Sequence, residues 1–399
     1  MKPINRTYST ERQNCLLKTS TPVYFISFIT LGLFASILGP TLPNLAENTS
    51  TSLSDIGLLF TARSLGYIIG SLQGGRAFDR FPGHVLLASI LIILGSVISF
   101  IPLVNWIWIL IALIFLLGIG EAILDVGVNL LIVWKYRGKA GPFLNALHFC
   151  FGIGAFLSPI LVAQAILITG EINWAFWFLS FFAFPIALWF LQLKSPKPTN
   201  NNFSNHRDQK NLFFVVIVAT LFTLYVGAEV SYGGWIFTFT TEQGLGDSTS
   251  AAYLTSAFWG ALTIGRLLGI PLANHMRPQK IIFFDLIGCL ISLGVILFFA
   301  NNYLAIWVGT LGLGLSMASF FPTMMAFAEK RIDLNGQITR WFFFAAGIGG
   351  MVLPWLFGIL FESIGALQAM WAIMIDLVLA LGLFGLGNLL LKKNLTNIS

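Results

Sequence analysis

The residues best suited to chemistry in this chain lie on one apolar segment, residues 106–134. Glu121, Asp125 and Asn129 occur there at intervals of four. In a helix this spacing stacks the three side chains on one face. Counting from the start of the segment places Glu121 near its middle and Asp125 one turn further. Two carboxylates this close repel each other, so one holds its proton more readily unless a cation lies nearby. The pattern therefore predicts an ion-binding site in apolar surroundings.

Two basic residues fall inside other apolar segments. Arg63 lies in residues 54–80 at a depth similar to that of Glu121 and Asp125, so we expect it to be the cation near these acids. A charge at the centre of a bilayer costs roughly 2.5 kcal/mol or more, which makes each such residue a functional candidate. A purely structural ion pair is the alternative. We expect Arg266 to pair with Asp285 in a structural role.

A second set of candidates lies on residues 212–242. Glu229 shares a helical face with Tyr232, just before the Gly233-Gly234 pair. A glycine pair is a place where a membrane helix can unwind and free backbone carbonyls for a cation or for hydroxyl groups. The ring of Trp235 could then stack on a small ligand. Alternatively, the glycines form only a close packing contact and the aromatic side chains belong to the core.

Asn145 and His148 are three residues apart on the segment 141–169 and share a helical face. Amide and imidazole groups both donate and accept hydrogen bonds, which suits a ligand rich in hydroxyl groups. A lone membrane histidine can otherwise be a packing residue. Trp259 and Trp341 are further aromatic candidates for the same ligand.

The elements that must position these residues are apolar helices. The chain is 57% hydrophobic and 10% charged, with a mean hydropathy of +0.84, which excludes an ordinary soluble protein. A membrane-spanning helix needs about 20 apolar residues. Twelve segments qualify, and they predict an all-α membrane protein: 22–45, 54–80, 84–104, 106–134, 141–169, 173–193, 212–242, 248–274, 279–300, 303–331, 337–364 and 366–391.

The second half of the chain repeats the glycine and proline pattern of the first, 195 residues later. The matching pairs include Gly32 and Gly227, Gly70 and Gly265, Gly152 and Gly347, Gly154 and Gly349, and Pro159 and Pro354. We therefore predict two pseudo-symmetric six-helix bundles, residues 22–193 and 212–391, with a linker at 194–211 and tails at 1–21 and 392–399. A duplicated six-helix unit is typical of secondary transporters, which alternate access to a site between the halves.

The basic residues predict the orientation in the membrane. All of the 22 lysines and arginines except Arg63 and Arg266 fall in the tails or in the connections on one side of the predicted helices. The positive-inside rule places both termini in the cytoplasm of a multi-pass protein of the plasma or bacterial inner membrane. The same bias accounts for the net charge of +6, so no nucleic-acid partner is expected.

Several classes of function are disfavoured. Cys15, Cys150 and Cys289 are isolated, which predicts neither a disulfide framework nor a metal site. No phosphate-cradling loop or supported nucleophile–base pair is present, so an enzyme is not expected. We expect a monomer in the lipid bilayer that takes a small-molecule solute and has no cofactor apart from a coupling ion, Na⁺ or H⁺.

The segment GSLQGGRAFDRFPGH, residues 70–84, resembles the cytoplasmic signature of the major facilitator superfamily. Gly75, Asp79 and Arg80 hold their places, whereas Pro82 displaces the next glycine and the final basic pair is replaced. In that superfamily the motif clamps the cytoplasmic gate. The resemblance therefore implies a gating role for Gly75, Asp79 and Arg80; capping of a loop is the alternative.

Within the superfamily, residues 22–365 resemble the branch that contains the sodium-dependent glucose transporters and is related to the fucose–proton symporters. The similar segments include ARSLGYIIGS, ALHFCFGIGAFLSPIL and YVGAEVSYGGWIFTF. Asp125 and Asn129 match an acidic-x-x-x-Asn pattern whose acid serves sugar or proton binding in the fucose permeases. Those proteins also carry an acid on their first helix, which residues 24–45 lack. The resemblance implies a sugar symporter. Because its first helix has no acid, we expect the ion-coupling residues to be Asp125 or Glu121 near Arg63, Glu229, or both sets.

Other classes remain open at this stage. An exporter of amphipathic drugs or metabolites usually has few hydrogen-bonding groups in its cavity, so Asn129, Asn145 and His148 argue against one. A facilitated uniporter could use the same acids structurally. A non-transporting receptor or scaffold need not keep ionisable residues on helices of both halves.

Overall fold

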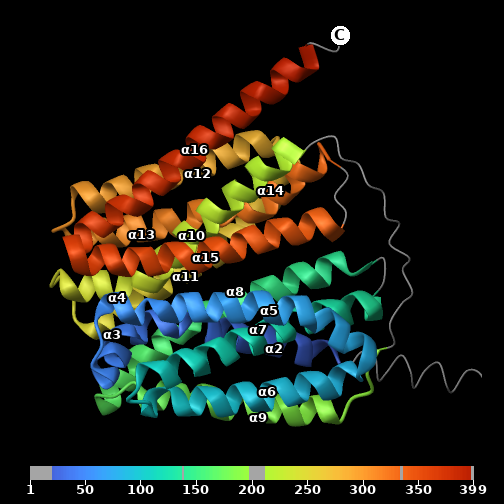
Figure 1. Ribbon diagram of the computed structural model, residues 1–399, viewed down its shortest axis with the longest axis vertical. Helices are drawn as coiled ribbons and strands as arrows, with labels where there is room; N and C mark the ends of the chain where they lie inside the picture. Colours follow the sequence, from blue (N-terminus) through green and yellow to red (C-terminus); the bar gives the residue numbers. More distant parts are fainter. Residues whose placement is uncertain (1–19, 137–138, 197–211, 333–335, 397–399) are drawn as a thin grey trace, which may run out of the picture.

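The computed structural model describes residues 20–136, 139–196, 212–332 and 336–396, and the regular structure in these ranges is helical (Figure 1). This confirms the predicted all-α class. The elements are α2 (Thr21–Ser36), α3 (Leu38–Thr49), α4 (Leu53–Ile56), α5 (Leu58–Arg80), α6 (Gly83–Phe100), η1 (Ile101–Leu103), α7 (Ile107–Tyr136), α8 (Gly141–Thr169), α9 (Asn173–Leu191), α10 (Leu212–Glu242), α11 (Ser248–His275), α12 (Pro278–Phe298), α13 (Tyr303–Met317), α14 (Phe320–Glu329), α15 (Gly336–Ile364) and α16 (Ala366–Thr396).

Ten helical segments in the described ranges are long and apolar enough to cross a membrane, and α2 with α3 makes an eleventh that bends by 46°. The bend lies just before Pro40, which has no N–H for the carbonyl of Ser36 four residues earlier. The remaining expected segment, 54–80, corresponds to α4 and α5. Its 23-residue helix α5 is less apolar because it carries Arg63 and a charged last turn.

The two halves repeat the same packing pairs. Helix α2 packs on α8 as α10 packs on α15, and α5 packs on α7 as α11 packs on α13. In Figure 1, α2–α9 form the lower half and α10–α16 the upper half. A Cβ at Gly154 would lie 1.9 Å from the carbonyl oxygen of Ile29, and one at Gly349 would lie 2.0 Å from that of Thr223. The repeated glycines therefore allow equivalent backbone contacts in the two halves.

We expect Gly154→Val to destabilise the first half. The new side chain would push α2 and α8 apart, because the atoms it meets belong to the backbone and cannot rotate away. Overpacking of a tight core costs about 1–3 kcal/mol. Thermal unfolding of the purified protein measures the effect. Gly141→Val is the control on the same helix, since its Cβ meets nothing within 4 Å. Equal melting temperatures for the two variants would contradict this interpretation.

The outer surface of the bundle is apolar. Side chains such as Ile168, Phe181, Phe298 and Leu304 are exposed by 70% or more of their maximum area. Soluble proteins rarely expose large contiguous apolar patches, whereas a bilayer solvates such a surface. The protein is therefore a multi-pass integral membrane protein.

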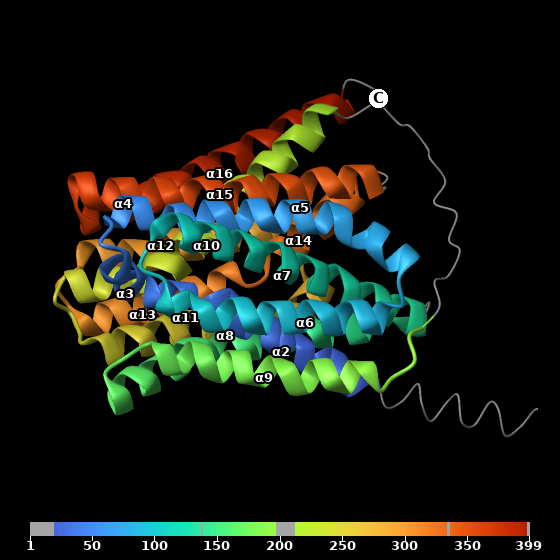
Figure 2. The ribbon, with the colours of Figure 1, turned by 60° about the horizontal axis from the view of Figure 1, so that its bottom comes forward.

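The two ends of the bundle differ in charge. We call one the basic end: it holds the connections α5–α6, α7–α8, α9–α10 and α11–α12, and Arg76, Arg80, Lys135, Lys194 and Lys280 lie there. The other, the opposite end, holds the connections α3–α4, α10–α11 and α15–α16. The long helices run between these two ends in Figures 1 and 2, and the short helices α3 and α4 lie at the opposite end.

The halves meet at the opposite end and separate toward the basic end. Helix α5 packs along α15, as Figure 2 shows, and Ile68 fits against Gly347 there. One turn nearer the basic end, on the same faces, Leu72 is 48% exposed and Phe343 is 53% exposed. At the opposite end the backbone N–H of Ser54 donates to the carboxylate of Glu362 at 2.8 Å. The conformation is therefore closed at the opposite end and open at the basic end.

Helices α8 and α11 also are in contact farther from the basic end and separate toward it. Gly152 meets Thr263 across the halves. One turn closer to the basic end on each helix, His148 is exposed and Leu267 is 44% exposed. The facing surfaces of both halves are thus accessible from the basic end down to about the level of Gly152.

Candidate functional site

Arg63 on α5 and Glu121 on α7 form a buried ion pair. The guanidinium Nε lies 2.8 Å from Glu121 Oε2, and Nη2 lies 3.0 Å from Oε1. Two parallel hydrogen bonds fix both side chains, because the planar fork matches the carboxylate. The third nitrogen, Nη1, donates to the carbonyl of Ala35 at 2.8 Å, just before the bend between α2 and α3. Arg63 therefore ties this bend to α5 and α7 and leaves Glu121 neutralised.

Asp125 lies one turn further along α7 and has different partners. The hydroxyl of Tyr67 donates to Oδ2, and the amide of Asn129 donates to Oδ1 at 2.8 Å. Both donors are neutral. We expected Arg63 to lie beside both acids of α7. It pairs with Glu121, whereas Asp125 accepts hydrogen bonds from Tyr67 and Asn129 instead. A buried carboxylate with neutral partners is the group most open to a proton or cation.

Sequence reasoning missed Tyr67. The pairs Arg63–Glu121 and Tyr67–Asp125 have the same separation of 58 residues, because α5 and α7 run in the same direction through the bundle. The signal was present, since the spacing of four between Glu121 and Asp125 recurs between Arg63 and Tyr67. What the sequence lacked was the register of the two helices. Close backbone contact sets it: a Cβ at Gly118 would lie 2.1 Å from the carbonyl oxygen of Arg63.

Asn145 and His148 on α8 are exposed, as a solute-contacting pair must be. The imidazole of His148 stands edge-on to Phe28, with a centroid distance of 5.9 Å. It also lies within electrostatic reach of Asp125 in its own half and of Arg266 in the other half. His148 is thus a predicted solute-binding residue within reach of charged groups of both halves.

Arg266 corrects a prediction. Its Nη2 lies 4.0 Å from Oε1 of Glu229, so Arg266 belongs with α10 and not with Asp285. The hydroxyl of Ser319 instead donates to the carboxylate of Asp285, with its oxygen 2.9 Å from Oδ1 and 2.8 Å from Oδ2. The reason is helix placement: α12 packs mainly on α13, α14 and α16, and its acid is bound by Ser319 at the start of α14. Each half therefore carries its own acid–arginine pair, tight for Arg63 and loose for Arg266.

Trp235 and Tyr232 do not line the open side in this conformation. Trp235 is fully buried among aromatic rings that include Phe60 and Phe361, and its Nε1 donates to the carbonyl of Pro354 at 3.0 Å. Tyr232 is also fully buried, with its hydroxyl 2.6 Å from that of Thr310. We expected an open stacking face at Trp235, but the ring instead forms part of the closed opposite end.

The Gly233-Gly234 pair lies inside the continuous helix α10, so no unwound segment is present. A Cβ on Gly39 of α3 would lie 2.9 Å from the carbonyl oxygen of Gly233, and one on Gly234 would lie 2.5 Å from Phe60. In this state the glycines act as the close packing contact that was the alternative interpretation. They let α3 and α5 of one half approach α10 of the other.

The remaining aromatic candidates differ from each other. Trp259 packs on α10 beside Gly233, and its buried indole N–H has no hydrogen-bond partner among the described residues. A buried donor without a partner is costly, which marks it as a place where a ligand oxygen can bind. Trp341 is 54% exposed near the basic end of α15 and stands edge-on to Phe344. It lies away from the charged pairs.

The residues of the signature motif lie at the basic end. Asp79 and Arg80 form the exposed last turn of α5, and Gly75 is one turn earlier with open space around it. The halves are apart at this end, so these side chains are placed where contacts must form if the basic end closes.

These features, two helical halves with charged residues on inner helices and one open end, define a membrane transporter. The chain matches the Major Facilitator Superfamily over residues 24–354, and it belongs to this family. It is a membrane transporter and not an enzyme.

Among proteins of known name, the chain is similar to sodium-dependent glucose transporter 1 of several vertebrates. It is 32% identical to the Danio rerio protein over 84% of this chain and 63% of that one. The Xenopus laevis protein is 31% identical over 84% and 73%, and the Homo sapiens protein is 30% identical over 84% and 72%. The chain thus spans slightly less than two thirds of the length of the first of these relatives.

Solved structures show the same fold. A mutant of the nucleoside transporter NupG superposes with a TM-score of 0.77 at 13% identity, covering 92% of this chain and 98% of that one. A D-xylose–proton symporter superposes with a TM-score of 0.74 at 15% identity, covering 91% and 96%. At these identities the likeness concerns the fold alone.

Proposed function

We propose that the protein carries a hexose-type sugar across the membrane by alternating access, in symport with sodium or protons. The observation that carries this proposal is the state of Asp125. Its neighbour Glu121 is neutralised by Arg63, whereas Asp125 is held by neutral donors and lies within reach of the exposed His148. One acid of the pair is therefore free to bind a cation. The names of the similar vertebrate proteins support the choice of sugar.

The sugar would bind where the two halves begin to separate. His148 and Asn145 offer donors and acceptors from the first half, and the unpartnered N–H of Trp259 offers a donor from the second. Asn129 contributes through its side-chain carbonyl oxygen, because its side-chain nitrogen already donates to Asp125. Such a set suits a neutral ligand with several hydroxyl groups.

We assign the basic end to the cytoplasm, since basic residues collect on the cytoplasmic side of membrane proteins. The described conformation is then open inward. Alternating access requires a second state in which the basic end closes around Gly75, Asp79 and Arg80 while the aromatic contacts around Trp235 open.

Uptake into proteoliposomes tests the proposal. Radiolabelled hexoses are offered under an inward sodium gradient, an inward proton gradient, or neither. Accumulation that occurs under just one of the two gradients supports symport and identifies the coupling ion. Equilibration without accumulation would indicate a uniporter. Failure with every hexose, combined with extrusion of amphipathic compounds, would favour the exporter class.

We expect Trp259→Phe to weaken sugar binding with little loss of maximal rate. Phenylalanine keeps an aromatic side chain beside Gly233 and removes the indole N–H, which has no hydrogen-bond partner among the described residues. Loss of a single hydrogen bond between neutral groups costs about 0.5–1.5 kcal/mol, so KM should rise roughly twofold to tenfold. Trp307→Phe is the control. Its indole N–H is also buried without a described partner, but it belongs to α13, whereas Trp259 belongs to α11. A similar rise in both variants would argue against a direct role of Trp259.

We expect Asp79→Ala to leave sugar binding nearly unchanged and to slow turnover. Asp79 is exposed in the open state, so its contacts form only when the basic end closes. Removing it shifts the balance between states and leaves the ligand site alone; such couplings are typically 1–3 kcal/mol, or roughly fivefold and more in rate. Equilibrium binding and net transport are measured on the same preparation. Loss of binding in a well-folded variant would place this loop in the site instead.

A further inference from the structure

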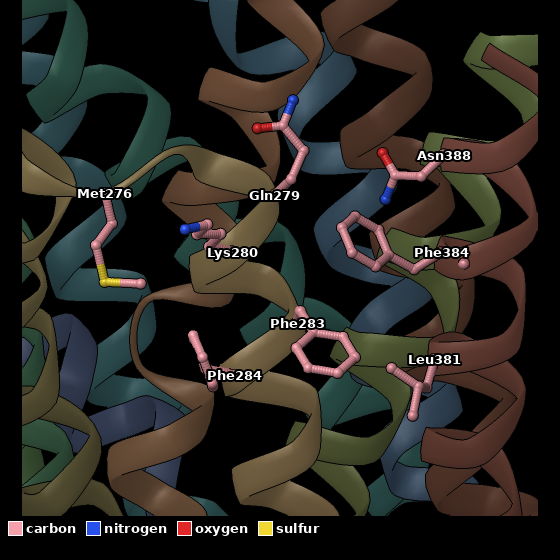
Figure 3. A pocket seen from close by; sticks show the side chains of 9 residues that line it. Met276, Gln279, Lys280, Phe283, Phe284, Leu381, Phe384 and Asn388 are labelled. Atoms are coloured by element: carbon pink, nitrogen blue, oxygen red, sulfur yellow. The ribbon is translucent and has the colours of Figure 1, made fainter. Parts of the chain in front are cut away.

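A groove lies on the outer surface of the second half, between α12 and α16 near the basic end (Figure 3). Its volume is about 680 Å³. The apolar wall consists of Phe283, Phe284, Leu381 and Phe384, and the polar rim includes Gln279, Lys280 and Asn388. Both rings on α12 are accessible, Phe283 by 46% and Phe284 by 59%.

The polar and apolar groups of the groove are separated by depth. Gln279 and Lys280 belong to the first turn of α12, and the two phenylalanines follow exactly one turn later in sequence, about 6 Å deeper. In Figure 3 the amides of Gln279 and Asn388 lie above the ring of Phe283, on the two walls of the groove, and Leu381 lies beside that ring. This is the order of groups in a membrane amphiphile, with a polar head at the surface and a chain below it.

The charge of the groove selects an anionic head. Lys280 is exposed, and the described residues that line the groove include no acid. Behind it, Nη2 of Arg331 contacts Oδ1 of Asn388 at 3.5 Å, which leaves the amide N–H groups of Asn388 for a ligand. Nη1 of Arg331 is buried and has no hydrogen-bond partner among the described residues. Lys280 and the two amides thus stand at the rim, and the guanidinium of Arg331 lies behind Asn388 with its Cζ 4.2 Å from the centre of the Phe327 ring.

We propose that this groove binds an anionic phospholipid of the surrounding bilayer. Lys280, Gln279 and Asn388 take the headgroup phosphate, and an acyl chain lies along Phe283, Phe284 and Leu381. Basic pockets between membrane helices bind anionic headgroups in this way. The groove is separate from the residues proposed to bind sugar, so this proposal does not depend on the proposed transport function.

Two glycines of α16 provide a matched test. Gly385 lines the groove and Gly382 does not, and a Cβ at either position meets nothing within 4 Å. Gly385→Leu therefore fills the groove without disturbing the helix packing, while Gly382→Leu makes the same chemical change one turn away. Native mass spectrometry of the full chain, titrated with phosphatidylglycerol or phosphatidylcholine, measures binding, and melting temperatures confirm folding.

We expect the wild type and Gly382→Leu to bind phosphatidylglycerol more tightly than phosphatidylcholine, and Gly385→Leu to lose this preference. Lys280→Gln should weaken phosphatidylglycerol binding about fivefold, as one basic residue near a membrane surface contributes. Lys194→Gln, an exposed lysine at the basic end of the other half, should have no such effect. Equal binding by the two glycine variants, equal affinity for the two lipids, or equal loss from the two lysine variants would each overturn the proposal.

Discussion

Asp125→Asn is expected to abolish the accumulation of sugar against its gradient while leaving exchange across the membrane measurable. The amide can still accept from Tyr67, so the fold of the site survives, but it can neither bind a proton nor offer a negative charge to sodium. Concentrative uptake should fall to the level of passive equilibration. Counterflow of labelled sugar, which needs binding but no net ion movement, should continue.

The control for this variant is Asp285→Asn. It makes the same change in a buried membrane acid of the second half, whose partner is the hydroxyl of Ser319. We expect it to accumulate sugar as the wild type does. Glu229→Gln tests whether the second half also contributes to coupling, since Glu229 is the acid in loose contact with Arg266. If Asp125→Asn and Glu229→Gln both concentrate sugar normally, these acids are not the coupling residues, and a uniporter is the better description.

The second large effect is expected at Glu121. Replacing it with leucine leaves the guanidinium of Arg63 in the protein interior without its fork partner, because Glu121 is only 2% exposed at its side chain. Removing one member of a buried pair typically costs 3–5 kcal/mol, so we expect a loss of about this size. Unfolding of the purified protein by a graded denaturing detergent measures it.

A double variant separates the charge from the packing. Arg63→Met combined with Glu121→Leu removes both charges and should recover most of the lost stability, since two apolar groups of similar volume replace the pair. The interaction with the carbonyl of Ala35 is also lost, so recovery should be incomplete. If Glu121→Leu alone were as stable as the wild type, Arg63 would have found another partner.

The fold could be predicted largely from the sequence, because its signals are local and repeated. Apolar length predicts the helices, and the glycines at fixed offset predict two equivalent halves; Gly154 and Gly349 show the physical cause in their matching backbone contacts. The depth of Arg63 and Glu121 also followed from counting residues. These quantities depend on one helix at a time.

The pairing of side chains could not be predicted in the same way, because it depends on the register and rotation of one helix against another. Arg266 was assigned to Asp285 because both lie at similar depth, whereas helix rotation turns it toward Glu229. The rotation of α10 could not be predicted either: residues 231–240 are all buried, so that stretch has no exposed side for a polar face to mark. Trp235 was therefore placed on the ligand side when its ring closes the opposite end.

That closure has a thermodynamic consequence. The contacts of Trp235 with Phe60, Phe357 and Phe361 are apolar, and opening the opposite end must bring part of this surface into contact with water. Exposure of apolar surface raises the heat capacity, so the enthalpy of the transition between the two states changes with temperature. A plot of the logarithm of the transport rate against reciprocal temperature should then curve when this opening limits turnover, and it should straighten in variants that trim the aromatic rings.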